Sequence, residues 1–360
     1  MMVGSALAVT AAPANAGLAP RYGSAYVWAN DPTSAIGVPY LPSLGYQFNS
    51  SFFQNRVIRQ GTGAYAVHFP GIDPYGTALV TAYGGSDERC KILSWAGAPG
   101  YPPPITDTWL HVRCFTRTGA PVNTRFTASY TYPEPGVARA AYLWHDQPSA
   151  PLGVVTTPSL TYQYNSEGSP NTVTRVATGA YFVRLTGLSL LPEVARNLQV
   201  TAYGAPADPS ASCSMGNDPA PPGEDEYPVN CYTAAGTPIN SSFVLTYVEN
   251  GNHLLAPTGS HPTALAQVTC HPLYPPPGCL IGEEFDTNPT ETASLDVIGP
   301  GQYAVHLPVS LSGGNVSVGN LFPGRCKVAY WSSAAGVRVN CSDLTGAAPV
   351  YITFAVSFVG

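Results

Sequence analysis

Short runs of alternating apolar and polar residues follow one another along the chain, and one run occurs three times. The string TGAYAVHFPG at 62–71 returns as TGAYFVRLTG at 178–187 and as PGQYAVHLPV at 300–309. Successive side chains of a strand point to opposite faces, so Tyr65, Val67 and Phe69 share one face. The other two copies carry tyrosine, valine and leucine there. This pattern predicts a strand that packs this face against a core, three times over.

Other runs recur in the same order and define the units. AYVWANDP (25–32) returns as AYLWHDQP (141–148), LVTAYG (79–84) as QVTAYG (199–204), and RFTASYTY (125–132) as SFVLTYVE (242–249), with TFAVSFVG (353–360) in the last copy. We therefore expect a leader segment over 1–22 and three repeats over 23–136, 137–249 and 250–360. The third repeat is the most divergent. Proline- and glycine-bearing joints are expected near 131–139 and 248–259.

The repeats have the composition of strands joined by turns. Runs rich in valine, threonine, tyrosine and phenylalanine are separated by glycine or proline at intervals of about 8 to 12 residues, and no stretch keeps a helical period. The 37 prolines and 36 glycines would interrupt any long helix. We predict an all-β fold of three tandem β-sandwich domains, immunoglobulin-like or jelly-roll, with about seven strands each.

Eight cysteines fit this repeat as disulfides. When the copies are aligned on their shared tyrosine, each carries a late pair, which is Cys90 with Cys114, Cys213 with Cys231, or Cys326 with Cys341. The last pair bounds RCKVAYWSSAAGVRVNC, which predicts two strands around a turn with the cysteines opposite each other. Cys270 and Cys279 remain, and we expect them to close the first loop of the third repeat.

A zinc site is the alternative for the remaining pair, with His261, His271, Cys270 and Cys279 as ligands. Zinc sites usually show short Cys-x2-Cys or His-x3-His steps, which are missing here. Thiolate ligands also suit a reducing compartment better than an exported chain. We therefore favour the disulfide and predict no metal site.

The N-terminus suggests export. A short apolar stretch runs into Ala14-Asn15-Ala16, a small-residue pattern that suits signal-peptidase cleavage, although a basic region before it is missing. A flexible alanine-rich leader is the other interpretation. No later stretch approaches the roughly 20 apolar residues that span a bilayer. We expect a secreted, extracellular protein without a membrane span.

Charge excludes one class of partner. Charged residues make up 10% of the chain, the net charge is -6, and there are only two lysines, Lys91 and Lys327. Nucleic-acid binding requires clustered positive charge along a surface. We therefore expect no nucleic-acid partner and consider an extracellular protein or a polysaccharide surface instead.

Catalytic motifs are missing from the sequence. It contains no G-x-S-x-G, H-E-x-x-H or phosphate-binding glycine loop. His68 of the recurring string is replaced by Arg184 in the second copy and by His306 in the third, and arginine is a poor general base. We predict no catalytic residue and no cofactor. The acidic clusters GEDE (223–226) and GEEFD (282–286) are interpreted as solvated loops, with weak calcium binding as the next alternative, and they are the places to look for a carboxylate pair for glycoside hydrolysis.

Aromatic residues offer a weak sign of ligand binding. The chain has 22 tyrosines and five tryptophans, and planar rings on a weakly charged β surface are what sugar-binding modules use for stacking. Trp28 and Trp144 are equivalent, as are Trp95 and Trp331, which we place at hairpin turns. A repeated tryptophan also suits a core, so these four residues are candidates for either role.

The recurring strings, from TGAYAVHFPG through VTAYG and RCKILSW to RCFTRTGAPVNTRFTASY, resemble repeats of exported, uncharacterised β-rich proteins of high-GC bacteria. The resemblance implies export and a tandem β architecture, and it implies no activity. Three functions are compatible with the sequence. They are a non-catalytic extracellular interaction or surface-structural protein, a lectin-like carbohydrate-binding protein, and a secreted hydrolase with its site in one repeat. We expect the first.

Overall fold

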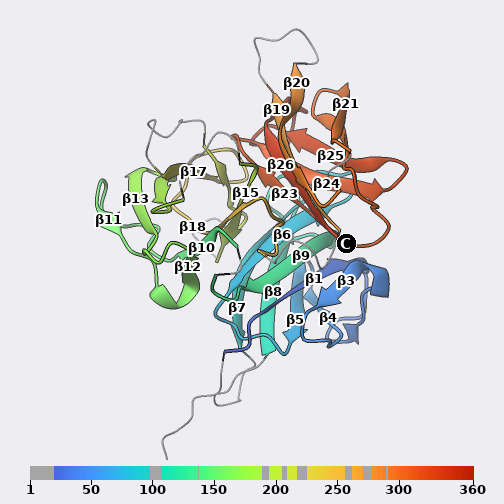
Figure 1. The fold of residues 1–360 in the computed structure, drawn as a ribbon, viewed down its shortest axis with the longest axis horizontal. Coiled ribbons are helices and arrows are strands. Elements are labelled where there is room, and N and C mark those ends of the chain that lie inside the picture. Colours follow the sequence, from blue (N-terminus) through green and yellow to red (C-terminus); the bar gives the residue numbers. More distant parts are fainter. Residues whose placement is uncertain are drawn as a thin grey trace, which may run out of the picture.

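The computed structural model describes residues 20–97, 107–136, 138–188, 194–204, 209–216, 225–255, 262–270, 278–288 and 291–360. Within these residues the fold is all-β, as predicted, with 26 strands in four sheets (Figure 1). Helical structure there is confined to two short 3-10 turns, η1 (Leu44–Tyr46) and η2 (Leu160–Tyr162).

The strands fall into three groups along the chain. The first segment, residues 23–132, contains β1 (Gly23–Ala29), β2 (Pro39–Tyr40), β3 (Gln47–Asn49), β4 (Arg56–Gly61), β5 (Ala64–Pro70), β6 (Thr77–Tyr83), β7 (Arg89–Gly97), β8 (Asp107–Phe115) and β9 (Arg125–Tyr132). The second segment, residues 140–249, contains β10 (Ala140–His145), β11 (Val155–Thr156), β12 (Gln163–Asn165), β13 (Thr172–Ala177), β14 (Ala180–Arg184), β15 (Arg196–Tyr203), β16 (Ser212–Met215), β17 (Glu226–Tyr232) and β18 (Ser242–Glu249). The third segment, residues 263–359, contains β19 (Thr263–Cys270), β20 (Cys279–Asp286), β21 (Ser294–Gly299), β22 (Gln302–His306), β23 (Asn315–Asn320), β24 (Arg325–Ser332), β25 (Gly336–Ser342) and β26 (Phe354–Val359). These counts exceed the seven strands expected, because each of the first two segments contains short strands of two or three residues, such as β2 and β11.

Each segment consists of two facing layers of strands. The inner layers have the orders β3-β1-β9-β6, β12-β10-β18-β15 and β20-β19-β26-β23. The outer layers have the orders β2-β4-β5-β8-β7, β11-β13-β14-β17-β16 and β21-β22-β25-β24. Tyr65, Val67 and Phe69 of β5 pack with Phe126 and Tyr130 of β9 in the core between the first two layers. The face of the recurring string that the sequence predicts to be buried therefore lies in the core.

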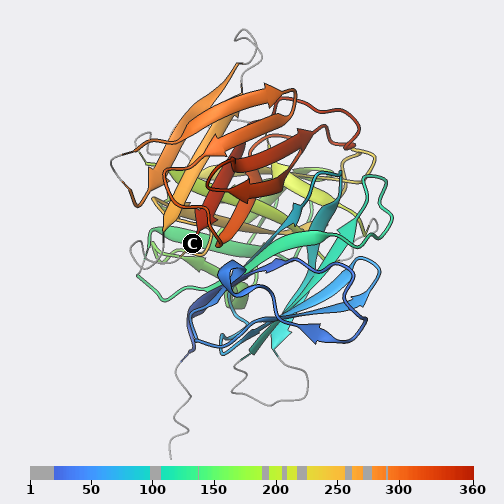
Figure 2. The same cartoon turned by 90° about the vertical axis from the view of Figure 1, so that its right-hand side faces the viewer.

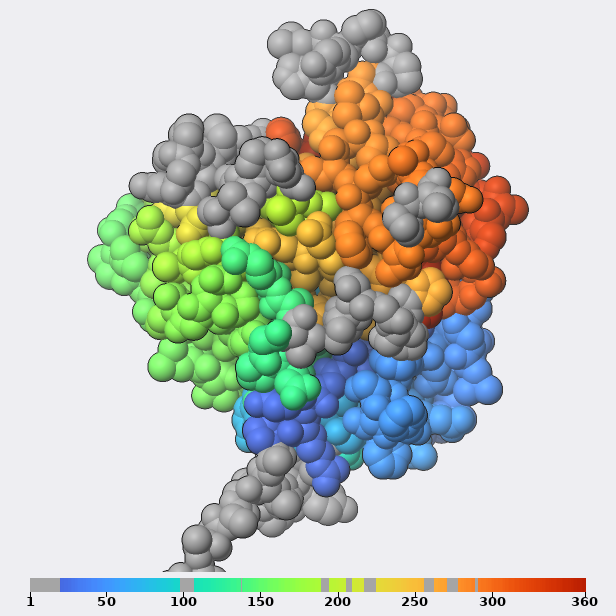
Figure 3. Space-filling model, viewed as in Figure 1, coloured from blue at the N-terminus to red at the C-terminus, as the bar shows by residue number. Residues whose placement is uncertain are grey.

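Two sheets run from one segment into the next. β24 of the third segment pairs in parallel with β6 of the first, where the amide of Gly84 donates to the carbonyl of Val328 over 2.9 Å. β7 of the first segment pairs in the same way with β15 of the second, and the amide of Gly204 donates to the carbonyl of Ile92 over 2.9 Å. The strands β6, β15 and β23 contact one another where the inner layers meet. Figures 1 and 2 show the three segments grouped around this centre, and Figure 3 shows them in close contact.

The recurring string has a structural explanation in its glycine and tyrosine. Gly63, Gly179 and Gly301 have φ values of 65°, 69° and 65°, and an added Cβ would collide with the carbonyl of Cys114, Cys231 or Cys341 respectively. Two residues on, the tyrosine hydroxyl accepts a hydrogen bond from a backbone amide at 3.2 Å in every segment. The donors are Thr124 for Tyr65, Ser241 for Tyr181 and Ile352 for Tyr303. In each segment the tyrosine therefore links the outer layer to the residues just before the last strand of the inner layer.

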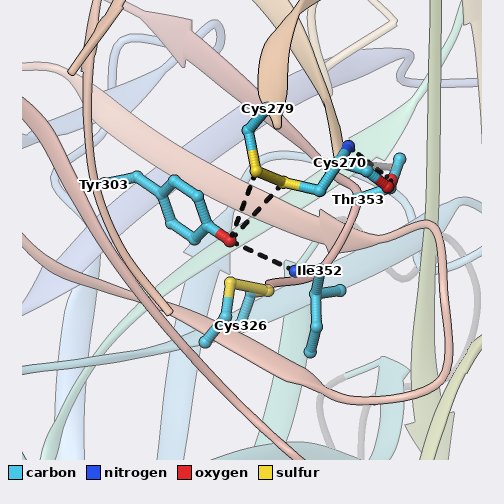
Figure 4. The surroundings of a disulfide bond; sticks show 7 residues. Cys270, Cys279, Tyr303, Cys326, Ile352 and Thr353 are labelled. Atoms are coloured by element: carbon cyan, nitrogen blue, oxygen red, sulfur yellow. Dashed lines mark hydrogen bonds between the residues drawn. A yellow bond between two sulfur atoms is a disulfide. The ribbon is translucent and has the colours of Figure 1, made fainter. Parts of the chain in front are cut away.

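Four disulfides join the cysteines as Cys90–Cys114, Cys213–Cys231, Cys326–Cys341 and Cys270–Cys279, the pairings expected from the repeat. The first three link facing residues of neighbouring outer strands. The fourth links the end of β19 to the start of β20. Figure 4 shows the hydroxyl of Tyr303 between that disulfide and the amide of Ile352, 3.5 Å from the sulfur of Cys270.

The chain between the second and third segments is buried. Residues 251–255 lie among the inner layers, where Leu254 packs with Tyr26 and Val359, and Leu255 packs with Tyr142. The expected joint at 248–259 is therefore, in its described part, a packed connection and not a loose linker. Residues 253–255 have the sequence His-Leu-Leu. They are buried because they offer apolar surface to the inner layers of all three segments.

Candidate functional site

An aromatic cluster joins the third segment to the first. It consists of Trp28 on β1, Tyr46 in η1, Tyr83 on β6 and Trp331 on β24. The ring of Trp331 lies 5.7 Å from that of Trp28 and 5.4 Å from that of Tyr83, both in edge-on geometry. The indole nitrogen of Trp331 donates to the carbonyl of Gly313 over 2.9 Å, and the residue is 7% exposed. This first aromatic cluster packs β24 onto the inner layer of the first segment.

A second aromatic cluster repeats this arrangement between the first and second segments. Trp95 on β7 contacts Trp144 on β10, Tyr162 in η2 and Tyr203 on β15, with ring centroids 6.3, 6.0 and 5.1 Å away. Trp95 is 6% exposed. In each cluster, a tryptophan from the outer layer of one segment packs against three aromatic rings of the neighbouring segment.

These contacts correct one expectation about the candidate tryptophans. Trp95 and Trp331 lie within strands and not at hairpin turns. Trp28 and Trp144 are half-buried and face them. Their rings pack edge-on or tilted against three other rings, so they do not form an exposed stacking platform. We assign these four side chains to the junctions between segments.

The junction between the second and third segments combines apolar packing of Ala195 against Leu265 and Ala355 with an ion pair. Arg196 on β15 forms a bidentate ion pair with Glu283 on β20, in a half-buried position. Glu284 accepts from the amide of Ala293 over 2.7 Å and Asp286 from that of Asn288 over 2.6 Å. The acidic cluster GEEFD therefore belongs to a strand and makes structural contacts, where a solvated loop was expected. Of GEDE, only Asp225 and Glu226 lie within the described residues.

A cavity of about 110 Å³ lies where all three segments meet. Strands β6, β7, β15, β16, β23, β24 and β25 contribute to its wall, and the residues Cys90, Cys213 and Cys326 stand at corresponding places around it. The exposed Ser86 and Asp87 border it, so it reaches the surface on that side. Each segment contributes to it the outer strand that follows β6, β15 or β23 in the chain, which is β7, β16 or β24.

Positive charge gathers at this cavity. The tripeptide Arg-Cys-Lys occurs on β7 as Arg89 to Lys91 and on β24 as Arg325 to Lys327, and the four basic residues all line the cavity. Lys91 and Lys327 are the only lysines of the chain and are 3% and 8% exposed. Buried lysines are rare in proteins because an ammonium group loses its hydration on burial. This concentration of cations is therefore a costly feature.

The two arginines reach across segment boundaries. Arg89 donates from Nε to the carbonyl of Ser210 in the second segment over 2.9 Å, and from Nη1 to the carbonyls of Thr116 and Arg117 over 2.9 and 3.1 Å. Arg325 donates from Nη2 to the carbonyls of Thr233 and Ala234, also in the second segment, over 3.2 and 3.1 Å. These contacts hold both guanidinium groups against the backbone of the second segment.

Lys327 pairs with Glu88 across the boundary between the third and first segments, with 2.9 Å between Nζ and Oε2. Burial lowers the pKa of Lys327 and outweighs the attraction of Glu88, which acts in the opposite direction. Burial also acts to raise the pKa of Glu88, but there the hydrogen bond and the charge of Lys327 win and the pKa is lowered. The difference fits the side-chain exposures, since Lys327 is the more buried partner.

A wider, shallower crevice of about 310 Å³ lies on the outer layer of the third segment. Tyr330, which is 45% exposed, faces Arg338 across the β24–β25 pair, and Gln302 and Asn340 complete the polar wall. Nε of Arg338 is buried and has no hydrogen-bond partner among the described residues. An exposed ring beside guanidinium and amide groups is a combination that can hold a sugar. Tyr330 was not among the residues picked from the sequence.

The histidines of the recurring string lie on the outer face, as expected. Nε2 of His68 is 3.0 Å from Asp107, and its ring stacks on Trp109 with 4.2 Å between centroids. His306 is 3.0 Å from Asp296, whereas Arg184 faces Glu226 across its strand pair. Each position thus has an acidic neighbour on the adjacent outer strand.

Metal and membrane features are absent from the part of the chain that the structure describes. No group of three or more His, Cys, Asp or Glu side chains there is arranged to hold a metal ion. His261 and His271 of the alternative zinc site lie outside the described residues, and Cys270 is bonded to Cys279. No described helix has the length and hydrophobicity needed to cross a membrane.

Sequence reasoning missed the central cavity, although a signal for it was present. The chain has two lysines in 360 residues, and each stands in an Arg-Cys-Lys tripeptide at the same place in its copy. The second copy has Ser212 and Ser214 around Cys213 at that place. This coincidence is a sequence signal for a shared position in the fold.

Comparison with protein-family models, with curated proteins and with solved structures found no match for this chain. Function is therefore inferred from its own residues.

Proposed function

We propose that this protein is a secreted, non-catalytic interaction or surface-structural protein, built from three β-sandwich repeats closed around a common centre. Its partner is an extracellular protein or polysaccharide surface. The four tryptophans of the aromatic clusters, together with Arg89, Arg325 and Lys327, make contacts that hold the segments together. What remains exposed is a weakly charged surface.

Strand order supports the immunoglobulin-like form of the sandwich over the jelly roll. An immunoglobulin domain has sheets A-B-E-D and C-F-G. If β4 to β9 are taken as A to F, and β1 as G, the orders β4-β5-β8-β7 and β6-β9-β1 are the same. The repeat would then be an immunoglobulin-like sandwich whose last strand has moved to the front of the chain.

Four disulfides support secretion. Such bonds form and persist in oxidising compartments and are rare in the cytosol. All eight cysteines are paired, and three of the bonds link neighbouring strands of the outer layers. The expected cleavage position at Ala14 to Ala16 lies outside the described residues, so the evidence for export here is the set of disulfides.

The observation that carries the interaction role is a pair of matched apolar loops. Leu44 and Leu160, at equivalent positions of the first two segments, are 72% and 70% exposed. The neighbouring aliphatic residues Ile36, Val38, Leu152 and Val154 are exposed as well.

Equivalent hydrogen bonds hold the two loops in shape. Nε of Arg59 donates to the carbonyl of Ser34 over 2.6 Å, and Nε of Arg175 donates to that of Ala150 over 2.5 Å. Exposed apolar patches of fixed shape are typical of binding surfaces. They bury apolar area when a partner binds, and little conformational entropy is lost because the loops are already ordered.

The test is retention on the surface of the cells that produce the protein. We expect the wild-type chain in the cell-surface fraction, with oxidised cysteines by mass spectrometry, and the L44S/L160S variant released into the medium. L280S removes a similarly exposed leucine of the third segment and should be retained. Reduced, cytosolic protein, or turnover of ester, peptide or glycoside substrates by the wild type, would rule the proposal out.

A carbohydrate-binding role is the second candidate, and the crevice at Tyr330 supports it. A glycan array and insoluble polysaccharides are suitable probes, with Tyr330→Ala and Arg338→Gln as variants. Tyr351→Ala is the matched control, because Tyr351 is similarly exposed, at 43%, and is not part of the crevice. Saturable binding that both crevice variants lose and the control keeps would favour this role over the first.

A further inference from the structure

The outer layer of the third segment ends in an uncovered strand. β21 pairs with β22 on one edge, and no described strand pairs with its other edge (Figure 1). In the first two segments a short strand covers the equivalent edge, since β2 pairs with β4 and β11 pairs with β13. The three edge strands correspond, because Arg59, Arg175 and Val297 each stand opposite the tyrosine of the recurring string. The third segment thus has an open edge where its two counterparts have a covered one.

The difference follows from the length of one connection. The chain from β1 to β3 runs through residues 30–46, and the chain from β10 to β12 runs through residues 146–162. Both stretches contain the covering strand. The chain from β19 to β20 has only residues 271–278, less than half as many, between the bonded Cys270 and Cys279.

Side-chain burial agrees with the missing strand. Val57 on β4 and Val173 on β13 are both 0% exposed. Leu295 holds the equivalent place on β21 and is only half-buried. An apolar side chain that two segments bury completely is therefore left partly open in the third.

The backbone of β21 also faces outward at this edge. In the covered segments the amide of a loop glycine donates to the carbonyl of Arg59 over 2.8 Å or of Arg175 over 2.9 Å. Backbone groups alternate in direction along an antiparallel strand, so Val297 and Leu295 direct their N–H and C=O groups away from β22. A row of such groups on an edge is a template for another strand.

We propose that an extended peptide segment of a partner protein pairs with the open edge of β21, in the place that β2 and β11 take in the other two segments. The inference rests on the proposed interaction role and names the kind of partner. In this mode of recognition the main-chain hydrogen bonds supply affinity, and pockets for alternate side chains supply specificity.

The side chains of the edge define the peptide. Tyr40 of β2 lies opposite Val57 and packs against the core, so the peptide residue opposite Leu295 should be apolar. Asp296 is on the outer face, where its side chain is 69% exposed and lies 3.0 Å from His306. A lysine or arginine opposite Asp296 would pair with it across the strands. The edge therefore suits a peptide that alternates apolar residues with at least one basic residue.

A second copy of this chain is a poorer occupant. Antiparallel pairing of two β21 strands in the central register sets Asp296 of one copy opposite Asp296 of the other. Like charges directly opposite each other are destabilising, and a charged side chain on an edge strand is one device that limits association between edges. The charge thus favours a foreign strand over self-pairing.

The first test examines the edge in the wild-type chain. Hydrogen exchange of the purified, oxidised protein is followed by NMR. We expect the amide of Leu295 to exchange at least about tenfold faster than those of Val57 and Val173, because solvent-exposed backbone groups open readily. Equal protection of the three amides would mean that the edge is already covered and would overturn the proposal.

The second test selects the occupant. A phage-displayed library of random peptides is panned on the oxidised wild-type chain, and enriched peptides are synthesised and titrated by fluorescence anisotropy. We expect alternating sequences with a basic residue, which slow exchange at Leu295 and Val297 when bound. Leu295→Pro removes an edge amide, a change that edge strands tolerate, and should weaken binding at least about tenfold. Leu295→Val keeps the amide and should bind like the wild type.

Three outcomes of the second test would overturn the proposal. They are the absence of any enriched peptide, binding that leaves exchange in β21 of the wild type unchanged, and a dimer of the chain that forms through β21. The exchange measurement uses the wild type alone, so it holds even where the Leu295→Pro variant fails to fold. A chain retained on the cell surface that binds no peptide at β21 would refute this inference alone, whereas a reduced, cytosolic chain would refute the proposed function.

Discussion

His253 illustrates at the residue scale how much polarity the centre of this protein buries. It is fully buried in the connection between the second and third segments, with Nε2 3.0 Å from Oδ1 of Asn315 and Nδ1 3.0 Å from Oγ of Ser357. Asn315 donates from Nδ2 to the carbonyl of Val27, so its Oδ1 accepts from His253. Nε2 therefore carries a hydrogen, and the ring is neutral at pH 7 because burial lowers the pKa of His253 to about 4.

Burial of two histidines predicts a loss of stability in mild acid. Burial lowers the pKa of both His253 and His145 to about 4. Between pH 6.5 and 4 the unfolded chain binds protons that the folded chain does not, so the free energy of unfolding falls as the pH falls. Each histidine should contribute about 3 kcal/mol over this range at 1.36 kcal/mol for each pKa unit. Urea unfolding at several pH values measures it, and a double variant, His145→Leu with His253→Gln, should flatten the curve. An unchanged slope would contradict the assignment.

His145 predicts a stabilising substitution. It packs against Tyr181 and Phe243 in the core of the second segment, and neither ring nitrogen has a hydrogen-bond partner among the described residues. A buried polar group that lacks a partner costs about 1 to 3 kcal/mol. His145→Leu should therefore raise the free energy of unfolding at pH 7 by about 1 kcal/mol after imperfect packing is counted. Chemical denaturation measures it, and a destabilised variant would mean that the imidazole has an unseen role.

At the scale of elements, a buried asparagine fastens β10 to β12, two neighbouring strands of the inner layer. Asn171 donates to the carbonyls of Tyr142 and Tyr164, both over 3.0 Å, and accepts from Asn165 over 3.1 Å. Asn55 makes the same contacts in the first segment. The third segment has the Cys270–Cys279 disulfide between the corresponding strands. The disulfide in the third segment and the asparagine hydrogen bonds in the other two thus join the same pair of strands.

Replacing Asn171 should lower the free energy of unfolding strongly. Asn171→Leu leaves two carbonyl groups and the side chain of Asn165 without their partner in a buried place, and we expect a loss of about 3 kcal/mol in the free energy of unfolding. Asn30→Leu, at an exposed hydrogen bond, should change it by less than about 0.5 kcal/mol. Equal effects in the two variants would show that the knot is not a principal support.

The aromatic clusters predict a second loss at this scale. Trp331→Ala removes the outer-layer ring of the first aromatic cluster, and truncation of a buried tryptophan costs about 3 to 5 kcal/mol. Trp109→Ala is the matched control, because Trp109 is half-buried on the outer face of the first segment and does not join segments. Proteolysis under native conditions should cut the Trp331→Ala variant faster than the control. Equal cutting rates would argue against a joining role.

The same elements explain what sequence reasoning reached. Strands of the outer layers have one buried face, so alternation at Tyr65, Val67 and Phe69 predicts the core correctly, and the paired cysteines follow from the repeat. The inner layers are covered on both faces. Thr81 and Ser317 are buried there and bond to each other, yet in sequence they look like solvent-facing positions. The neighbours of Trp95 come from the next repeat, so local pattern alone does not predict its burial.

For the whole molecule, the closed arrangement rests on three kinds of contact. Two sheets pass from one segment to the next, the connection at 251–255 is packed among the inner layers, and Arg89 and Arg325 cross segment boundaries. Repeats that touch only at linkers unfold separately, whereas repeats that share sheets and cores lose stability together. The segments should therefore behave as one cooperative unit.

This predicts one compact particle and one unfolding transition. A single compact body of 360 residues has a radius of gyration of about 21 Å, and small-angle X-ray scattering on the oxidised chain should give a value near this one. Calorimetry should show one transition whose calorimetric and van't Hoff enthalpies agree. A clearly larger radius, or separate transitions assigned to the three segments, would mean that the shared sheets contribute little. If the Trp331→Ala variant shows more than one transition and a larger radius of gyration, the cooperativity depends on the junctions between segments.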